Sequence, residues 1–311
     1  MNNFTSVDDV QNPQELIKQV LEIKQNKPHT TLGKNKTLGL IFFNPSLRTR
    51  LSTQKAGTNV GMDVIVMNIN ADSWNIEFED GAVMDGSTQE HIKDAVQVIS
   101  GYCDIMGVRT FANLQDPDED YKEKVLSEFV EHSSVPLISL ESATLHPLQS
   151  LTDMATITEF GIKRPKVVLS WAPHPKKLPQ AVANSFLEWI VKTDAETILT
   201  HPEGYELNEK FTKNISIVNN QVEALKEADF VYTKNWSSYA HYGQTPEVKE
   251  NWTITEDKMN LTNEGKFMHC LPIRRNVVAT DEVIEKSLVY QQAKNREYAA
   301  QAVIQNILEE L

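Results

Sequence analysis

The chain has 311 residues, of which 40% are hydrophobic and 23% are charged, a composition typical of a soluble globular protein. This length exceeds the size at which a single core usually stops growing, so two domains are expected. The formal net charge of -13 argues against a nucleic-acid-binding surface, which concentrates Lys and Arg into stripes. It does not exclude an anionic small-molecule ligand, because such a ligand needs only a local pocket of positive charge.

The sequence also restricts the cellular context. No apolar run approaches the length of a membrane span, and the first residues lack the basic and apolar regions of a signal peptide. We therefore expect a cytoplasmic protein without a membrane partner. The two cysteines, Cys103 and Cys270, are too few for a disulfide scaffold and are expected to be thiols. No clustered Cys/His spacing resembles a metal site.

The first half of the chain alternates between helix and strand patterns. Helices are predicted over residues 13–27, 47–60 and 91–100, and strands over 38–43, 64–68 and 103–108. Residues 70–89 are polar and lack a clear periodicity. Loops of that length are uncommon and often functional.

The second half begins with a predicted helical segment over residues 141–160. Strands are predicted over 166–171, 196–200, 229–233 and 266–270, and helices over 178–191, 221–228 and 294–311. Thr280 is a good N-cap for a short helix that begins at Asp281. The whole pattern predicts an α/β fold with two doubly wound parallel-sheet domains, joined by interdomain helices near residue 150.

The segment Ile41–Arg50 passes from an apolar strand through a turn into a helix. Ser46, Arg48 and Thr49 then lie where backbone N–H groups point outward and the helix dipole favours an anion. Two hydroxyls and a guanidinium added to those amides make a phosphate cradle. A capped helix with basic residues on a solvated face is the structural alternative, and the local sequence does not decide between the two.

Three further segments carry polar residues at the ends of predicted elements. Arg109 follows a strand, at the carboxyl edge where α/β sheets bind ligands. His146–Gln149 lies at a predicted helix start, and His269–Pro272 follows the last strand. Taken singly, each has a structural interpretation, since a lone His is usually a satisfied structural residue and a buried Cys usually behaves as a small hydrophobe.

Together these segments resemble the aspartate and ornithine carbamoyltransferase family, in family order, over residues about 44 to 296. Ser46–Arg50 resembles its Ser-Thr-Arg-Thr-Arg phosphate motif, and His146–Gln149 resembles its His-Pro-x-Gln element. His269–Pro272 resembles the His-Cys-Leu-Pro signature of the ornithine branch, and Asn295-Arg296 resembles the pair that opens the final helix. The resemblance implies a carbamoyl-phosphate-binding domain over residues 1–150, completed by a helix at 291–311, and an acceptor domain over 151–290.

The resemblance implies carbamoyl transfer from carbamoyl phosphate to an amine, a reaction that needs no metal or organic cofactor. The implied carbamoyl-phosphate site consists of Ser46, the Leu47 backbone, Arg48, Thr49, Arg109, His146, Gln149 and Arg296. Arg109, His146, Gln149 and Cys270 are the implied catalytic residues. The Cys270 thiol and the Leu271 carbonyl resemble the groups that receive the acceptor's terminal nitrogen. The motifs do not decide whether the thiol or the phosphate takes the proton, and a packing role for Cys270 stays open.

Two departures from the plain ornithine branch indicate a different acceptor. Lys234 stands where that branch has an Asp that pairs with the free α-ammonium of ornithine, and a lysine would repel that ammonium. Arg274 adds positive charge directly after the His-Cys-Leu-Pro signature. Both departures resemble the N-acylornithine carbamoyltransferases. The implied acceptor-binding residues are Trp74, Gln89, Glu141, Lys176, Lys234, Cys270, Leu271 and Arg274.

The identity of the acyl group depends on charge. A succinyl tail adds a carboxylate that suits Lys234 and Arg274, with Arg275 and Lys176 as further candidates. Acetyl-preferring relatives have Glu at the position of Gln89, and succinyl-preferring relatives have Pro. Because Gln89 lacks the repelling charge, N-succinylornithine is favoured and N-acetylornithine comes next, within arginine biosynthesis.

The resemblance also implies a homotrimer in which Trp74 and the loop around Gln89 reach the site of a neighbouring subunit. The alternative for Trp74 is a surface aromatic residue, since scattered exposed apolar side chains are normal.

Three other functions stay as alternatives. An ordinary ornithine carbamoyltransferase conflicts with Lys234. A catalytically silent anion-binding relative is expected to have lost a motif residue, yet all of them are present. A nucleotide-binding α/β protein is expected to carry G-x-G-x-x-G or Walker-type motifs, which this sequence lacks.

Overall fold

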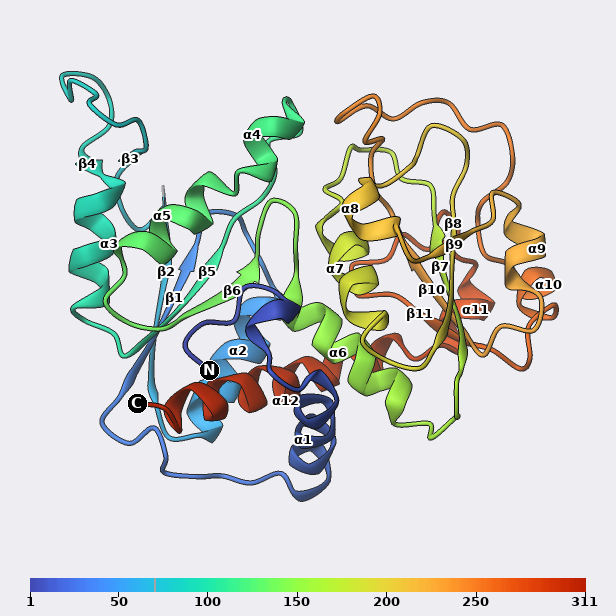
Figure 1. Cartoon of the computed structure of the whole chain (residues 1–311), viewed down its shortest axis with the longest axis horizontal. Helices are drawn as coiled ribbons and strands as arrows, with labels where there is room; N and C mark the ends of the chain where they lie inside the picture. The colour runs from blue at the N-terminus through green and yellow to red at the C-terminus, as the bar shows by residue number, and fades with distance from the viewer. Residues whose placement is uncertain (70) are drawn as a thin grey trace. The chain divides into compact units, whose positions relative to one another are not determined.

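The computed structural model describes residues 1–69 and 71–311, and the chain divides into two compact units (Figure 1). Unit 1 consists of Met1–Ala112, Asp118–Leu148 and Arg296–Leu311, and unit 2 of Asn113–Pro117 and Gln149–Asn295. Each unit contains its own parallel sheet with helices, which confirms the predicted fold class. The chain passes from one unit to the other within helices α6 (Pro147–Thr158) and α12 (Val289–Leu308), and also at both ends of the short segment Asn113–Pro117.

The sheet of unit 1 has four parallel strands in the order β2-β1-β5-β6. Their bounds are Thr37–Phe42 (β1), Asp63–Asn68 (β2), Ile105–Arg109 (β5) and Leu137–Glu141 (β6). Strands β1 and β5 are neighbours although β2 lies between them in the chain. The chain therefore leaves β1 towards one end of the strand order and leaves β5 towards the other. The carboxyl ends of β1 and β5 form the switch point where doubly wound sheets bind ligands.

The remaining elements of unit 1 surround this sheet. They are the 3₁₀ turn η1 (Val7–Asp9), helices α1 (Pro13–Asn26), α2 (Arg48–Asn59), α3 (Ile92–Ser100) and α5 (Lys124–His132), and the short strand pair β3 (Ile76–Glu77) and β4 (Glu90–His91). Helix α2 packs closely on the sheet at Gly57, where a Cβ atom would lie 2.9 Å from Leu38 and 3.0 Å from Val64. A Cβ atom there would force the Leu38 and Val64 side chains to move, so glycine allows α2 to lie close to β1 and β2.

The sheet of unit 2 has five parallel strands in the order β11-β10-β7-β8-β9. Their bounds are Lys166–Trp171 (β7), Glu196–Thr200 (β8), Ser216–Ile217 (β9), Phe230–Lys234 (β10) and Lys266–Met268 (β11). Its switch point lies between β7 and β10. The helices α7 (Ala181–Ile190), α8 (Glu209–Thr212), α9 (Gln221–Leu225), α10 (Glu256–Met259) and α11 (Asp281–Glu285) complete the unit.

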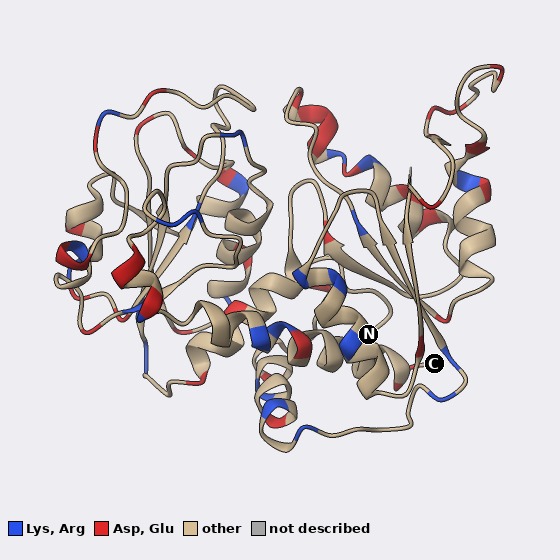
Figure 2. Cartoon of the chain, turned by 180° about the vertical axis from the view of Figure 1, so that it is seen from behind, with Lys and Arg blue, Asp and Glu red and all other residues tan. Residues whose placement is uncertain are grey.

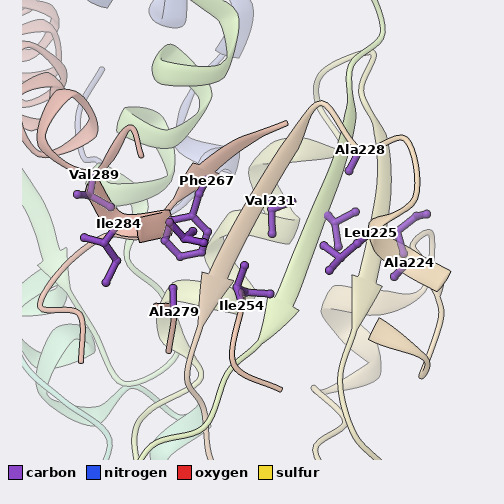
Figure 3. Close-up of a cluster of buried hydrophobic side chains, with 12 residues drawn as sticks. Ala224, Leu225, Ala228, Val231, Ile254, Phe267, Ala279, Ile284 and Val289 are labelled. Atoms are coloured by element: carbon purple, nitrogen blue, oxygen red, sulfur yellow. The ribbon is translucent and has the colours of Figure 1, made fainter. Parts of the chain in front are cut away.

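One hydrophobic cluster of unit 2 is drawn in Figure 3. Val231 and Phe267 come from adjacent strands, and Leu225, Ile254 and Ile284 pack against them from the connecting segments. Burial of each large side chain of this kind contributes roughly 1.5–3 kcal/mol. This packing fixes the strands whose carboxyl ends carry the predicted acceptor residues.

Acidic and basic side chains are interspersed over the helices and loops on the side drawn in Figure 2. The most compact acidic group visible there is on α4 (Pro117–Tyr121), whose first turn holds Asp118, Glu119 and Asp120. Among the helices in the described part of the chain, none combines the length and the apolar character that a bilayer span requires.

The predicted strands at 38–43, 64–68, 103–108, 166–171, 196–200 and 229–233 are confirmed, with bounds that differ by at most two residues. The predicted helix over 141–160 is wrong at its start, because Glu141 ends β6 and α6 begins at Pro147. A fully buried parallel strand has no alternation to separate it from a buried helix.

Other predicted bounds are also corrected. Strand β11 ends at Met268, helix α9 ends at Leu225, helix α7 begins at Ala181 and helix α12 begins at Val289. The predicted loop over 70–89 contains β3, and its first residue, Asn70, lies outside the described residues. Thr280 is the N-cap of α11, but its side chain makes no capping hydrogen bond.

Candidate active site

The predicted phosphate cradle lies at the switch point of unit 1, after β1. Helix α2 begins at Arg48, with Leu47 as its N-cap. Leu47 makes no side-chain capping bond, and the first turn contains no acidic residue. The helix end therefore keeps its positive partial charge for an anion. Ser46 precedes this end and Thr49 lies in its first turn, as the anion-site prediction requires.

Arg109 is the last residue of β5 and is 7% exposed. Its Nη1 atom donates to the carbonyl oxygens of Asn44 (2.9 Å) and Pro45 (2.5 Å). Its Nε and Nη2 atoms donate to Oε2 of Glu141 at 3.2 and 2.9 Å. The rigid guanidinium fork thus ties the cradle loop after β1 to the end of β6.

His146 lies directly before α6, and its Nε2 atom is 3.7 Å from Oε2 of Glu141. Glu141 therefore stands between Arg109 and His146, within unit 1. The Glu141 carboxylate, which is predicted to contact the acceptor, is hydrogen-bonded here to Arg109. One buried carboxylate here accepts hydrogen bonds from Arg109 and lies next to His146.

The loop that carries His146 is anchored by Glu123. The Glu123 carboxylate accepts hydrogen bonds from Ser142 Oγ (2.6 Å), Ala143 N (3.0 Å), Thr144 N (2.7 Å) and Thr144 Oγ1 (2.6 Å). Bonds to a charged acceptor are the stronger class of hydrogen bond. Together with the bonds between Ser142 and Leu145, this side chain holds residues 142–144 and with them the approach of the chain to His146.

Substitution Glu123→Ala is expected to lower kcat by about tenfold and to reduce the free energy of unfolding by about 1–3 kcal/mol, because several buried donors lose their charged acceptor. Steady-state kinetics and chemical denaturation measure the two effects. Glu119→Ala is the matched control, since Glu119 forms an exposed i,i+3 ion pair with Lys122. A wild-type kcat in Glu123→Ala would contradict the anchoring role.

Arg296 brings the C-terminal helix to the cradle. Its Nη2 atom donates to Thr49 Oγ1 at 2.6 Å, across 247 residues of sequence. Both side chains are buried, at 7% and 3% exposure. The structure therefore gathers Arg109, His146, Arg296 and the 46–49 segment in unit 1, and Gln149 follows in the first turn of α6.

The predicted acceptor side of the chain begins after β11. Cys270 is 8% exposed and lies beside Tyr232, whose phenol has a pKa raised well above its ordinary value by burial and by the neighbouring acidic groups Asp153 and Cys270. Leu271 has φ 56°, and its N–H donates to His269 Nδ1 at 2.9 Å. A left-handed conformation costs an L-residue roughly 1–2 kcal/mol, so the surrounding contacts must hold it.

The switch point of unit 2 collects positive charge around His174. Lys234 is the last residue of β10, and the segment with His174 and Lys176 follows β7, its direct neighbour. Arg274 Nε donates to His174 Nε2 at 3.0 Å. With its proton on Nδ1, the neutral imidazole also donates to the Lys176 carbonyl at 2.9 Å. Partial burial lowers the pKa of His174, and the charges of Arg274, Lys234 and Lys176 lower it further.

The lowered pKa of His174 predicts that the stability of the folded chain depends on pH. As pH falls below about 6.5, the unfolded state binds the His174 proton before the folded state does, so stability is lost until the folded pKa is passed. NMR titration should give a His174 pKa that is below the ordinary value and that rises in Arg274→Met. Lys226→Met is the control and should leave it unchanged, because the Lys226 carbonyl accepts from Nζ of Lys166 at the start of β7, whereas His174 follows the end of β7. A His174 pKa unaffected by Arg274→Met would contradict the contact.

Trp74 and Gln89 lie in the segment that carries β3 and β4. Trp74 is 51% exposed, and its indole N–H donates to Glu90 Oε2 at 2.8 Å. The backbone N–H of Gln89 donates to the Asn75 carbonyl at 3.1 Å. These bonds hold the two predicted acyl-group contacts near one another on an exposed part of unit 1.

One predicted residue, Arg275, has surroundings other than a ligand site. Arg275 pairs with Asp281 (2.7 Å) and Glu285 (2.8 Å), which raises the pKa of its guanidinium. A cavity of about 700 Å³ in unit 2 is lined by Gln221, Trp252 and Lys258 among others, and the predicted acceptor residues are not in its lining. In residues 1–69 and 71–311, no group of three His, Cys, Asp or Glu side chains is arranged to hold a metal ion.

Sequence reasoning missed three residues of this region. Asp153 accepts a hydrogen bond from Gln149 and lies one helical turn after it. The i,i+4 spacing in a predicted helix could therefore have indicated this contact. His174 lies two residues before the predicted acceptor residue Lys176 but has no motif of its own. Glu123 carried no signal, because its partners are 19 to 21 residues away.

Comparison with known proteins identifies the protein family to which the chain belongs. Residues 2–159 match the family model described as aspartate/ornithine carbamoyltransferase, carbamoyl-P binding domain, and residues 179–307 match its Asp/Orn binding domain. The chain belongs to the aspartate/ornithine carbamoyltransferase family, which confirms the resemblance inferred from the motifs. It is therefore a group-transfer enzyme.

Individual relatives show which members of this family the chain is similar to. The chain is 49% identical to N-succinylornithine carbamoyltransferase of Bacteroides fragilis (strain 638R), over 100% of both chains. It is 36% identical to N-acetylornithine carbamoyltransferase of Xanthomonas campestris pv. campestris, over 93% and 92% of the two chains. A crystal structure of acetylornithine transcarbamylase with acetylcitrulline has a TM-score of 0.91 and 33% identity, over 99% of each chain.

Proposed function

We propose that this chain transfers the carbamoyl group of carbamoyl phosphate to the δ-amine of Nα-succinyl-L-ornithine, giving N-succinylcitrulline and phosphate. The observation that carries this proposal is the cationic cluster at the switch point of unit 2, formed by Lys176, Lys234 and Arg274 around His174. Such a cluster suits an acceptor with carboxylates and no α-ammonium. The 49% identity to an N-succinylornithine carbamoyltransferase supports the same choice.

The first substrate, carbamoyl phosphate, is assigned to the residues of the cradle. Its phosphate is bound by Ser46, the Leu47 backbone, Arg48, Thr49 and Arg296. Arg109 and His146 donate hydrogen bonds to the carbonyl oxygen as negative charge develops on it. Gln149 accepts a hydrogen bond from the carbamoyl NH₂. Preorganised donors of this kind are the largest single contribution in many acyl transfers. Residues 1–150 with the helix at 291–311 form the carbamoyl-phosphate domain.

The second substrate is assigned to residues 151–290, with contacts from elsewhere. The δ-amine must arrive neutral, although a free alkylamine is mostly protonated at neutral pH. Cys270 and the Leu271 carbonyl receive this nitrogen and hold it against the carbonyl carbon. Proximity of this kind supplies much of the rate enhancement without a covalent intermediate.

Acylation of the α-amine decides between the acceptors. Lys234 repels the α-ammonium of free ornithine but tolerates the neutral amide of an acylated one. A succinyl group adds a carboxylate for the same cationic cluster, and an acetyl group does not. Gln89 carries no charge that would repel the succinyl carboxylate. N-acetyl-L-ornithine is therefore the second candidate, which the 36% identity to an N-acetylornithine carbamoyltransferase supports.

The assembly is proposed to be a homotrimer in the cytoplasm that serves arginine biosynthesis. The half-exposed Trp74 supports shared sites, because an indole of that size gains most from burial against a partner. Trp74, Gln89 and Glu141 would then contact the acceptor in the assembled enzyme. Size-exclusion chromatography with light scattering tests the trimer.

The test of function is product formation from carbamoyl phosphate with ornithine, N-acetylornithine and N-succinylornithine in parallel. We expect the highest kcat/KM with N-succinylornithine, a lower value with N-acetylornithine and none with ornithine. Activity with free ornithine alone would contradict the interpretation of Lys234. Absence of turnover with all three would favour another acceptor or a silent relative.

A further inference from the structure

Asp153 is a fully buried carboxylate on α6 that the proposed reaction does not use directly. Its Oδ1 atom accepts two hydrogen bonds of 2.7 Å, one from Gln149 Nε2 and one from Gln292 Nε2. Gln149 lies one helical turn earlier on the same helix, and Gln292 lies on α12. All three side chains are fully buried and belong to unit 2.

These contacts fix the direction of both amides. Asp153 Oδ1 accepts from Nε2 of both glutamines, so each glutamine turns its NH₂ group towards Asp153. Each amide oxygen then points elsewhere. For Gln292, that oxygen accepts from the backbone N–H of His269 at 3.0 Å.

The consequence for Gln149 concerns the carbamoyl group. A carbamoyl NH₂ has only hydrogens to offer, so its partner must present an oxygen. A Gln149 amide turned by 180° would present its own NH₂ and repel the substrate. The contact with Asp153 excludes this orientation, because the Gln149 oxygen would then face a carboxylate.

We propose that Asp153 is a positioning residue that orients Gln149 for carbamoyl recognition and, through Gln292, holds the backbone at His269, next to Cys270 and Leu271. One carboxylate thereby supports the residues proposed for both substrates. This inference rests on the proposed function, because it takes from it the role of Gln149 as the partner of the carbamoyl NH₂.

A neighbouring contact separates positioning from simple packing. One turn further along α6, Thr156 Oγ1 accepts from Asn295 Nδ2 at 2.9 Å, which is another buried polar contact between α6 and α12. Thr156→Val removes that contact without touching Gln149. It is the matched control for a variant that only weakens helix packing.

The experiment measures binding without turnover, so that it does not depend on the acceptor. Calorimetry compares phosphonoacetamide, which has a carbamoyl NH₂, with methylphosphonate, which lacks the carbamoyl group. In Asp153→Ala, the Kd of phosphonoacetamide should rise at least about tenfold, while that of methylphosphonate stays within about twofold. Asp153→Asn should give a smaller rise, because its oxygen still accepts but carries no charge. Thr156→Val should leave both constants unchanged while lowering Tm.

The experiment distinguishes failure of the proposal for Asp153 from failure of the proposed function. Unchanged phosphonoacetamide binding in Asp153→Ala, or an equal loss for both ligands, would overturn the proposal. If Asp153→Ala does not fold, the same comparison in Asp153→Asn decides, and no selective loss there overturns it. Failure of the proposed function would appear as absent wild-type turnover with every acceptor, whatever the binding data show.

Discussion

Replacement of Arg109 by lysine is expected to lower kcat by about 10²–10³-fold, the range seen when one preorganised oxyanion donor is lost. The Arg109 guanidinium donates to two cradle carbonyls and to Glu141 at the same time. A lysine keeps the charge that the buried Glu141 needs, but its single nitrogen does not reproduce the planar fork. The fold should therefore survive while the donor aimed at the carbonyl oxygen is displaced. Steady-state kinetics and the thermal midpoint measure the two quantities.

Arg275→Lys is the matched control for this substitution. Arg275 also forms two carboxylate contacts, with Asp281 and Glu285, but all three side chains are well exposed. Exposed ion pairs contribute about 0–1 kcal/mol, so Arg275→Lys should change neither kcat nor stability appreciably. If Arg109→Lys retains more than about a tenth of wild-type kcat, Arg109 does not act at the transition state.

The sheets were predictable because their strands are short apolar runs bounded by polar turns. Strands β7 and β8 have the predicted bounds, and β1, β2, β5 and β10 deviate little. The strands place Arg109 and Ser46 at neighbouring carboxyl ends, but the pattern left a capped helix as the alternative to a phosphate cradle, and only the family resemblance favoured the cradle. Periodicity failed at β6, because a strand buried on both faces has no polar alternation.

The contacts that orient the site were not predictable in the same way. Arg296 reaches Thr49 across 247 residues, and the resemblance to a family motif, not any local pattern, indicated its role. Glu123 supports the loop before His146 through bonds that exist only in the folded chain. Asp153 lies between the predictable and the unpredictable contacts. Its helical spacing from Gln149 is visible in the sequence, but nothing else in the sequence relates the two residues.

Specificity for the acceptor depends on the charges at the switch point of unit 2. Burial and the surrounding cations lower the pKa of His174 there, which favours the neutral imidazole that accepts from Arg274. A dianionic ligand would offset the positive charges of Arg274, Lys234 and Lys176 together. The binding free energy of such a ligand should therefore be divided among several side chains rather than assigned to one.

Substitution Lys234→Asp tests this charge assignment most strongly. It restores the residue type of plain ornithine enzymes, so it should repel a succinyl carboxylate and attract an α-ammonium. Loss of a charge-assisted contact costs about 1.5–3 kcal/mol, so KM for N-succinylornithine should rise roughly 10–150-fold. The KM for N-acetylornithine should rise less, and turnover of free ornithine should become measurable.

The backbone of Lys234 pairs with β7 through its carbonyl, which accepts from Ala172 N at 3.0 Å, so the side-chain change leaves the sheet intact. Lys213→Asp makes the same charge change on an exposed residue of unit 2 after α8 and should alter no KM. Equal losses for N-succinylornithine and N-acetylornithine in Lys234→Asp would show that Lys234 does not distinguish the acyl groups. A gain of ornithine turnover without loss of N-succinylornithine would show that Lys234 excludes the α-ammonium but does not bind the succinyl carboxylate.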